Sequence, residues 1–313
     1  MKQFEGKTVL VTGASGFIGS KLAERFSSVS GIKLILLGRE VAESACGSVL
    51  RFKCALSELR PGFWEDAGFT KIDYVFHLAA FTPKNHQEAN SLERVVSDNI
   101  CGTHTLLASL TIPVGKLIYS STLDVYEKPK TGDVLSEASR LSPETLYGSS
   151  KLFCEKLVTE WSKQNNVDCS VLRYGHIYGP GEEKYCKLIP LTINKLLQGK
   201  SPVVFGKGED LRDFLYVEDA VEATIRAACK DCRGAAINIV SGSSVPILNI
   251  VQTLVRLVNP EIDIQFIPAS TPGVSLRFDS SGMFEVLGRW SLTALEDGLA
   301  SEIKAHKERA NEQ

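Results

Sequence analysis

A glycine-rich stretch directly after an apolar run constrains the fold of this chain more than any other feature. The β-branched run Thr8–Thr12 predicts a strand, and residues 17–28 have the pattern of a helix. Between them the sequence is Gly13-Ala-Ser-Gly16-Phe-Ile-Gly19. Gly13 permits a sharp turn, Gly16 lets the backbone approach a pyrophosphate, and Gly19 lets the helix pack close to the sheet. This order predicts a dinucleotide-binding loop with the contact residues Gly13, Ser15, Gly16, Phe17, Ile18 and Gly19.

Apolar runs alternate with helical patterns through the first half of the chain. Further runs begin near residues 33, 72, 116 and 168, and helical patterns cover residues 92–110 and 147–163. This alternation predicts an α/β fold with a Rossmann-type, doubly wound parallel sheet. We expect residues 1–175 to form this domain, with segments near 205–240 returning to it. Proline and glycine become frequent later, so residues 176–313 are expected to form a smaller, mixed C-terminal substrate lobe.

Composition excludes several classes of partner. The chain has 313 residues, 43% of them hydrophobic and 23% charged, which is typical of a globular protein. Its net charge of -2 argues against nucleic acid or an anionic membrane as a partner. The eight cysteines are scattered and no signal peptide precedes them, which indicates reduced thiols and a cytoplasmic protein. Cys229 and Cys232 lack a second pair, so no metal site is expected.

The end of the second apolar run bears on the choice of cofactor. An NAD-specific site usually places an acidic residue there for the adenosine ribose. This chain has Gly38 and Arg39, and arginine can pair with a 2′-phosphate through two charge-assisted hydrogen bonds. The sequence therefore favours NADP over NAD. In the alternative, Arg39 is merely exposed or stacks on the adenine, and Glu40 serves the ribose.

Tyr147 and Lys151 lie four positions apart, on consecutive turns of one predicted helix face. A nearby ammonium favours the tyrosine phenolate, so Tyr147 can act as general acid in reduction and general base in oxidation. Upstream, Ser120-Ser121-Thr122 ends a predicted strand at the carboxyl edge of the sheet, where ligands bind. A hydroxyl there can hold the oxygen of a substrate.

Together these motifs resemble the extended short-chain dehydrogenase/reductase family of NAD(P)-dependent nucleotide-sugar epimerases, dehydratases and ketoreductases. The resemblance covers nearly the whole chain and includes the segments 12–19, 77–80, 121–126, 147–151, 173–181 and 212–219. It implies an enzyme in which Thr122, Tyr147 and Lys151 are catalytic. It also implies that Leu78, Ala79, Ala80 and Asn99 lie along the cofactor.

The resemblance further implies a nucleotide-diphosphate sugar as substrate. Arg212 matches a residue that contacts the diphosphate, and Lys187 and Leu188 match a segment of the nucleotide pocket. Asp124 and His176 are candidate sugar contacts, although relatives usually have asparagine at the position of His176. A phosphate-binding arginine near residue 271 is missing, and Arg277 is the candidate substitute.

Three functions remain open at this point. The first is an NADPH-dependent 4-ketoreductase of a 4-keto-6-deoxy sugar nucleotide, which Arg39 favours. The alternative is a nucleotide-sugar 4-epimerase, which would use the same residues without net redox change. A non-catalytic NAD(P)-binding sensor is less favoured, because both Tyr147 and Lys151 are present. A 4,6-dehydratase is disfavoured because Leu123 stands where dehydratases carry an acid. The resemblance also implies a homodimer joined through residues 92–110 and 147–163.

Overall fold

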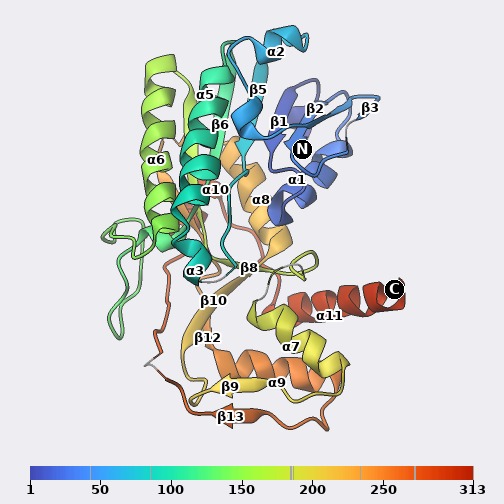
Figure 1. Ribbon diagram of the computed structural model, residues 1–313, viewed down its shortest axis with the longest axis vertical. Coiled ribbons are helices and arrows are strands. Elements are labelled where there is room, and N and C mark those ends of the chain that lie inside the picture. Colours follow the sequence, from blue (N-terminus) through green and yellow to red (C-terminus); the bar gives the residue numbers. More distant parts are fainter. Residues whose placement is uncertain are drawn as a thin grey trace. The chain divides into compact units, whose positions relative to one another are not determined.

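The structure is a computed structural model that describes residues 1–42, 44–84, 86–183, 185, 187–232, 234–270 and 273–312 (Figure 1). The chain forms two compact units. Unit 1 consists of Met1–Glu127, Arg140–Tyr174 and Val221–Ile237, and unit 2 consists of Lys128–Ser139, Gly175–Ala220 and Asn238–Gln313. Residues 128–139 thus belong to unit 2 although the sequence analysis assigned them to the first domain, and the return to unit 1 begins at Val221.

Within the described chain, the main sheet has eight strands in the order β11-β7-β6-β5-β1-β2-β4-β3. These strands are β1 (Thr8–Thr12), β2 (Lys33–Gly38), β3 (Ser44–Cys46), β4 (Val49–Lys53), β5 (Ile72–His77), β6 (Val114–Thr122), β7 (Asp168–Tyr174) and β11 (Ala236–Ile239). The ladders from β7 to β4 are parallel, and β3 pairs antiparallel with β4 at the edge. The predicted Rossmann-type parallel sheet is confirmed.

Helices of unit 1 cover both faces of this sheet. They are α1 (Phe17–Ser27), α2 (Phe63–Asp66), α3 (His86–Ala89), α4 (Leu92–Arg94), the π-helix η3 (Val95–Cys101), α5 (Gly102–Ser109) and α6 (Leu146–Asn165). Helices α5 and α6 run side by side (Figure 1), and their apolar residues share a buried core with Leu10, Val75 and Leu117 of the strands. On the other face, Phe26 of α1 packs its ring 5.1 Å from that of Phe76.

Unit 2 has a mixed architecture. Its strands are β8 (His176–Tyr178), β9 (Val203–Phe205), β10 (Leu211–Tyr216), β12 (Ser244–Pro246) and β13 (Gln265–Ile267), in the two sheets β12-β10-β8 and β13-β9. Its helices are α7 (Leu188–Leu197), α9 (Ile247–Val258), α10 (Ser281–Leu287) and α11 (Leu295–Glu312), and α8 (Val217–Ala228) begins in it. Ile193, Leu254 and Leu299 form its buried core with other apolar residues. No helix in the described part of the chain is both long and apolar enough to cross a membrane.

Candidate active site

The glycine loop lies tightly against the segment that follows β5. Gly13 has a φ of 70°, and a Cβ atom there would lie 2.7 Å from the Ala79 amide nitrogen. A Cβ atom on Gly19 would collide with the Gly13 carbonyl oxygen. Gly16 is the N-cap of α1, and no side chain of the described residues caps it. The loop therefore fits a group bound by backbone amides at a helix N-terminus, as a pyrophosphate is.

The other residues expected at the cofactor gather around this loop. Ser15 lies beside the end of β2, where a Cβ atom on Gly38 would be 3.4 Å from the Ser15 hydroxyl oxygen. Phe17 and Ile18 form the first turn of α1. Leu78, Ala79 and Ala80 follow β5 directly, and the Ala79 amide donates to the Thr12 hydroxyl at 3.2 Å. All of these positions lie at the carboxyl edge of unit 1's parallel strands.

A buried histidine that the sequence analysis did not single out supports this edge. His77 is fully buried and is hydrogen-bonded through Nδ1 to the Thr12 hydroxyl and through Nε2 to the Thr103 hydroxyl, both at 2.9 Å. Burial, and then the charge of Lys151, lower the pKa of His77 to about 3. A neutral His77 thus ties β1, β5 and α5 together. The sequence feature that could have indicated this role is a histidine at the end of an apolar strand.

Arg39 follows β2 and lies on the surface with its side chain 60% exposed. Its Nη1 atom is 3.3 Å from the Asp98 carboxylate, which also accepts from Arg94 at 3.4 Å. A 2′-phosphate bound by Arg39 would therefore compete with a carboxylate that is already in place. The sequence analysis did not anticipate this pairing, because Asp98 lies 59 positions away.

Asn99 connects the cofactor side of unit 1 with α6. It lies in the π-helix η3, and its side-chain oxygen accepts a hydrogen bond from the Phe81 amide at 2.8 Å. Its side-chain nitrogen donates to the Ser150 hydroxyl at 3.0 Å. Ser150 in turn donates to the Tyr147 carbonyl at 2.7 Å. Asn99 therefore orients the chain after Ala80 and the first turn of α6.

Tyr147 and Lys151 lie on the first two turns of α6. Tyr147 is 8% exposed and packs with Phe81, Ala89 and Val95. Lys151 is 2% exposed, and its ammonium lies 4.5 Å from the centre of the Tyr119 ring. Burial lowers the pKa of Lys151 to about 8, although the neighbouring Cys154 and Glu155 oppose the shift. A lysine so placed is a cation at neutral pH with few waters around it, so its field acts strongly on nearby groups.

Thr122 ends β6 and begins the short 3-10 helix Leu123–Val125, where its hydroxyl accepts from the Asp124 amide at 3.3 Å. This turn lies against the start of α6, since a Cβ atom on Gly148 would collide with the Asp124 carbonyl oxygen. Gly148 therefore allows the turn that carries Thr122 to approach the turn that carries Tyr147. The sequence analysis overlooked Gly148. It could have been noticed because glycine is unusual inside the first turn of a predicted helix.

Several residues expected at the substrate lie in unit 2. His176 of β8 pairs in register with Phe214 of β10, next to Arg212. Burial, followed by the charges of Arg212 and Lys187, lowers the pKa of His176 to about 4. The Arg212 Nη1 atom donates to the Leu211 carbonyl at 2.8 Å and to the Val274 carbonyl. Unit 2 therefore brings together one neutral imidazole and two cations.

Lys187 is the N-cap residue of α7, and Leu188 is the first residue of that helix. The Lys187 ammonium pairs with the buried Glu182 carboxylate at 2.9 Å, which leaves the lysine side chain 46% exposed. Arg277 is exposed, and its carbonyl accepts from the Leu135 amide at 2.9 Å. Thr271 and Pro272, where the missing arginine was noted, lie outside the described residues.

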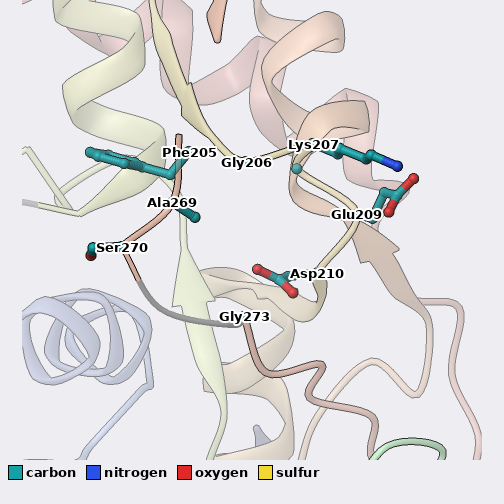
Figure 2. A pocket seen from close by; sticks show the side chains of 9 residues that line it. Phe205, Gly206, Lys207, Glu209, Asp210, Ala269, Ser270 and Gly273 are labelled. Atoms are coloured by element: carbon teal, nitrogen blue, oxygen red, sulfur yellow. The ribbon is translucent and has the colours of Figure 1, made fainter. Parts of the chain in front are cut away.

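A pocket of about 410 Å³ lies in unit 2 (Figure 2). It is lined by Phe205, Gly206, Lys207, Gly208, Glu209, Asp210, Ala269, Ser270 and Gly273. Phe205 is 65% exposed, and Lys207, Glu209 and Asp210 contribute charged side chains to the lining. The lining thus combines one aromatic side chain with charged groups of both signs.

Comparison with known proteins identifies the family of this chain. A family model described as the NAD dependent epimerase/dehydratase family matches residues 9–240. The chain belongs to this family. The family resemblance inferred from the sequence is thereby confirmed.

Individual relatives share this family and fold. A dTDP-D-glucose 4,6-dehydratase of Dictyostelium discoideum is 32% identical over 69% of this chain and 54% of that protein. A UDP-N-acetyl-alpha-D-glucosaminuronate decarboxylase of Bacillus cytotoxicus is 31% identical over 84% of each protein. The crystal structure of UDP-glucuronic acid 4-epimerase from Bacillus cereus in complex with NAD has a TM-score of 0.82 and 25% identity, covering 96% of this chain and 99% of that one. The chain spans about half the length of several curated relatives that it matches.

Proposed function

We propose that this chain is an NAD-dependent 4-epimerase of a nucleoside-diphosphate sugar. The buried Lys151 next to Tyr147, opposite the turn that carries Thr122, is the observation that carries the chemistry. Similarity to an epimerase structure that holds NAD favours this function over the ketoreductase that the sequence analysis preferred. Arg39, the residue that favoured the ketoreductase, is already paired with Asp98.

The proposed reaction needs a proton acceptor and an oxygen-binding group on the protein. NAD, when bound at the glycine loop, supplies the acceptor for the hydride of the sugar carbon. Tyr147 takes the proton of the hydroxyl group as hydride leaves and returns it when hydride comes back to the opposite face. Lys151 favours the phenolate through its charge. Thr122 holds the sugar oxygen, with Asp124 as a neighbouring polar contact.

We assign the substrate's nucleotide to unit 2. Arg212 and Lys187 are proposed to bind the diphosphate, because a pyrophosphate needs cationic partners. Leu188 and Phe205 are proposed to offer apolar surface for the nucleoside. His176 is proposed as a neutral polar contact, and Arg277 as an exposed cation near the substrate. UDP-sugars are the first class to test, since the epimerase structure reported above is of a UDP-sugar enzyme.

Three other functions differ from the proposed one, either in the residues they require or in their turnover. The 4,6-dehydratase reaction requires an acid after Thr122 to expel water, and this chain has Leu123 there. The ketoreductase would consume reduced cofactor in proportion to product. The non-catalytic sensor would bind cofactor and turn over nothing.

The test incubates the protein with NAD and, in turn, UDP-glucose, UDP-N-acetylglucosamine and UDP-glucuronic acid. Formation of the 4-epimer without net change of absorbance at the reduced-cofactor band supports the proposal. Tyr147→Phe should lower kcat by about 10²–10⁴-fold, the usual size of a general acid–base contribution, while NAD affinity stays within a factor of a few. Stoichiometric oxidation of NADPH by a 4-keto-6-deoxy sugar nucleotide, without epimer formation, would select the reductase instead.

We also propose a homodimer through the helices at residues 92–110 and 147–163. Leu92, Leu146 and Phe153 are large apolar side chains exposed on these helices, with Phe153 at 52%. Phe153→Glu should convert a dimer to a monomer in sedimentation velocity, whereas Phe266→Glu, at an equally exposed phenylalanine of unit 2, should not. A wild-type protein that sediments as a monomer at all concentrations contradicts the proposal.

A further inference from the structure

Four polar residues beside Thr122 have no part in the proposed chemistry, yet they form one buried network. They are Ser121, Tyr126, Glu155 and Arg173, all less than 9% exposed. Three belong to motifs that carried the family resemblance, but neither the sequence nor the proposed mechanism gave them a role. All four lie within unit 1, on β6, the chain after it, α6 and β7.

The network centres on a buried ion pair with two bonds. The Arg173 Nε atom donates to Glu155 Oε1 at 3.0 Å, and its Nη2 atom donates to Oε2 at 2.8 Å. Glu155 Oε1 also accepts from the Ser121 hydroxyl. The remaining Arg173 nitrogen, Nη1, donates to the Tyr126 hydroxyl at 2.9 Å. Each charge is thereby neutralised and hydrogen-bonded, which a buried pair requires.

This geometry holds the chain on both sides of Thr122. Ser121 immediately precedes Thr122, and Tyr126 follows the 3-10 turn that Thr122 begins. Glu155 lies one helical turn after Lys151 on α6. A single ion pair therefore connects the segment that carries the hydroxyl to the helix that carries Tyr147 and Lys151.

We propose that the Glu155–Arg173 pair positions Thr122 against α6 and sets the charge around Lys151. The inference rests on the proposed function, because it assigns these residues to the same reaction. Glu155 and Arg173 are positioning residues, since neither is placed at the sugar or the cofactor.

The pKa of Lys151 provides a test of the pair, because a mere loosening of the packing would not shift this pKa in opposite directions in two variants. The titratable groups that act on it or lie beside it are Cys154 and Glu155 on its own helix, Tyr147 one turn before, His77 of β5 and Tyr119 of β6. Glu155 is the anion among them and raises the pKa of Lys151. Removal of Glu155 takes away this anion and also leaves Arg173 as an uncompensated cation. Both effects disfavour the charged form of Lys151. Removal of Arg173 has the opposite effect, since it leaves an uncompensated anion.

The first experiment measures Lys151 directly and needs no sugar. The protein is labelled with [ε-¹³C]lysine, and the Lys151 resonance is assigned with Lys151→Met. We expect Glu155→Gln to lower the midpoint of the Lys151 titration by about one pH unit, and Arg173→Met to leave it unchanged or raise it. An equal shift in both variants, or no shift in either, would overturn the assignment of the pair to the charge of Lys151.

The second experiment separates position from stability. The double variant Glu155→Met/Arg173→Met removes both charges, so it should fold with a Tm close to that of the wild type. Its kcat on the sugar nucleotide converted in the panel above should nevertheless fall about tenfold or more, because Thr122 has lost its support. A double variant with wild-type Tm and wild-type kcat overturns the positioning role.

A matched control lies at the other end of the same two strands. Lys116 of β6 and Asp168 of β7 form a partly buried pair at 2.7 Å. Asp168→Asn should lower Tm while leaving both the Lys151 titration and kcat unchanged. If no sugar in the panel is converted, the proposed epimerase function fails, whereas the difference between the Lys151 titrations of the two single variants remains measurable.

Discussion

Burial of the Lys151 ammonium links stability to pH. Its pKa in the folded chain is about 8, compared with 10.5 in its ordinary state. Between these values the unfolded chain binds more protons, so the free energy of unfolding rises with pH. We expect Lys151→Met to be more stable than the wild type at pH 7 by up to about 3 kcal/mol. The difference should vanish above about pH 10.5, as followed by urea unfolding at each pH. A difference that stays constant with pH would contradict the lowered pKa.

The Arg39–Asp98 pair leads to a prediction about cofactor preference. An exposed pair contributes about 0–1 kcal/mol, and Asp98 also repels an added phosphate. Asp98→Asn should therefore strengthen NADP binding about fivefold and leave NAD binding unchanged, as measured by fluorescence titration. Arg39→Ala should weaken NADP binding by about 1.5–3 kcal/mol, the size of hydrogen bonds to a charged group, again without effect on NAD.

The control for this prediction is Asp66→Asn, which removes another exposed pair, Arg60–Asp66, of the same unit. It should change neither affinity. Equal losses for NAD and NADP in Arg39→Ala would show that Arg39 does not discriminate at the 2′ position.

The contact between α6 and the turn after β6 depends on a glycine, because a side chain at this position would not fit. Gly148 lies in the first turn of α6, where its amide donates to the Thr145 hydroxyl at 3.0 Å. Gly148→Ala would push the helix away from the Asp124 carbonyl. A displacement near 1 Å costs about 10²-fold in rate, so kcat should fall by that amount while NAD affinity is retained. Ser149→Ala, one residue further on the exposed side of the helix, should leave kcat unchanged.

Individual elements show how far the sequence could be interpreted. The strands at residues 8–12, 72–77 and 168–174 were predicted correctly, because each is a continuous apolar run between turn residues. Residues 92–110 were predicted as one regular helix, but η3 inserts a π-helical segment around Asn99. Periodicity cannot reveal this, because the segment is stabilised by Phe81 and Ser150, which are distant in sequence. The short strands β3 and β4 were not among the predicted strands, because neither segment shows a clear alternation of apolar and polar residues.

The candidate site was predictable to the extent that it depends on local motifs. The glycine loop, Tyr147 and Lys151 are recognisable because their chemistry requires fixed residue types at fixed spacing. Asp98, Gly148 and Glu155 were not, since each acts through a partner brought close only by folding. The assignment of every site residue to cofactor or substrate stays a prediction that the experiments above address.

The division into two units predicts how the whole chain unfolds. Trp64 and Trp161 lie in unit 1 and Trp290 lies in unit 2, so each unit has its own fluorescent reporter. Leu299 is fully buried in the core of unit 2. Leu299→Ala should lower the stability of that unit by about 2–5 kcal/mol.

The measurement uses urea unfolding of Leu299→Ala in two backgrounds. With Trp290→Phe the signal reports unit 1, and with Trp64→Phe/Trp161→Phe it reports unit 2. We expect the midpoint to shift more for unit 2 than for unit 1. Identical shifts in both backgrounds would show that the two units unfold as one.

The order of strands in the main sheet also has a consequence for biosynthesis. Seven of its eight strands are encoded before residue 175, whereas β11, at the edge beside β7, is encoded only at Ala236–Ile239. On the ribosome, the nascent chain therefore exposes the outer edge of β7 until more than sixty further residues have been translated. Chaperones that bind unpaired strand edges should engage that interval of translation, and ribosome profiling of chaperone-bound nascent chains would locate it.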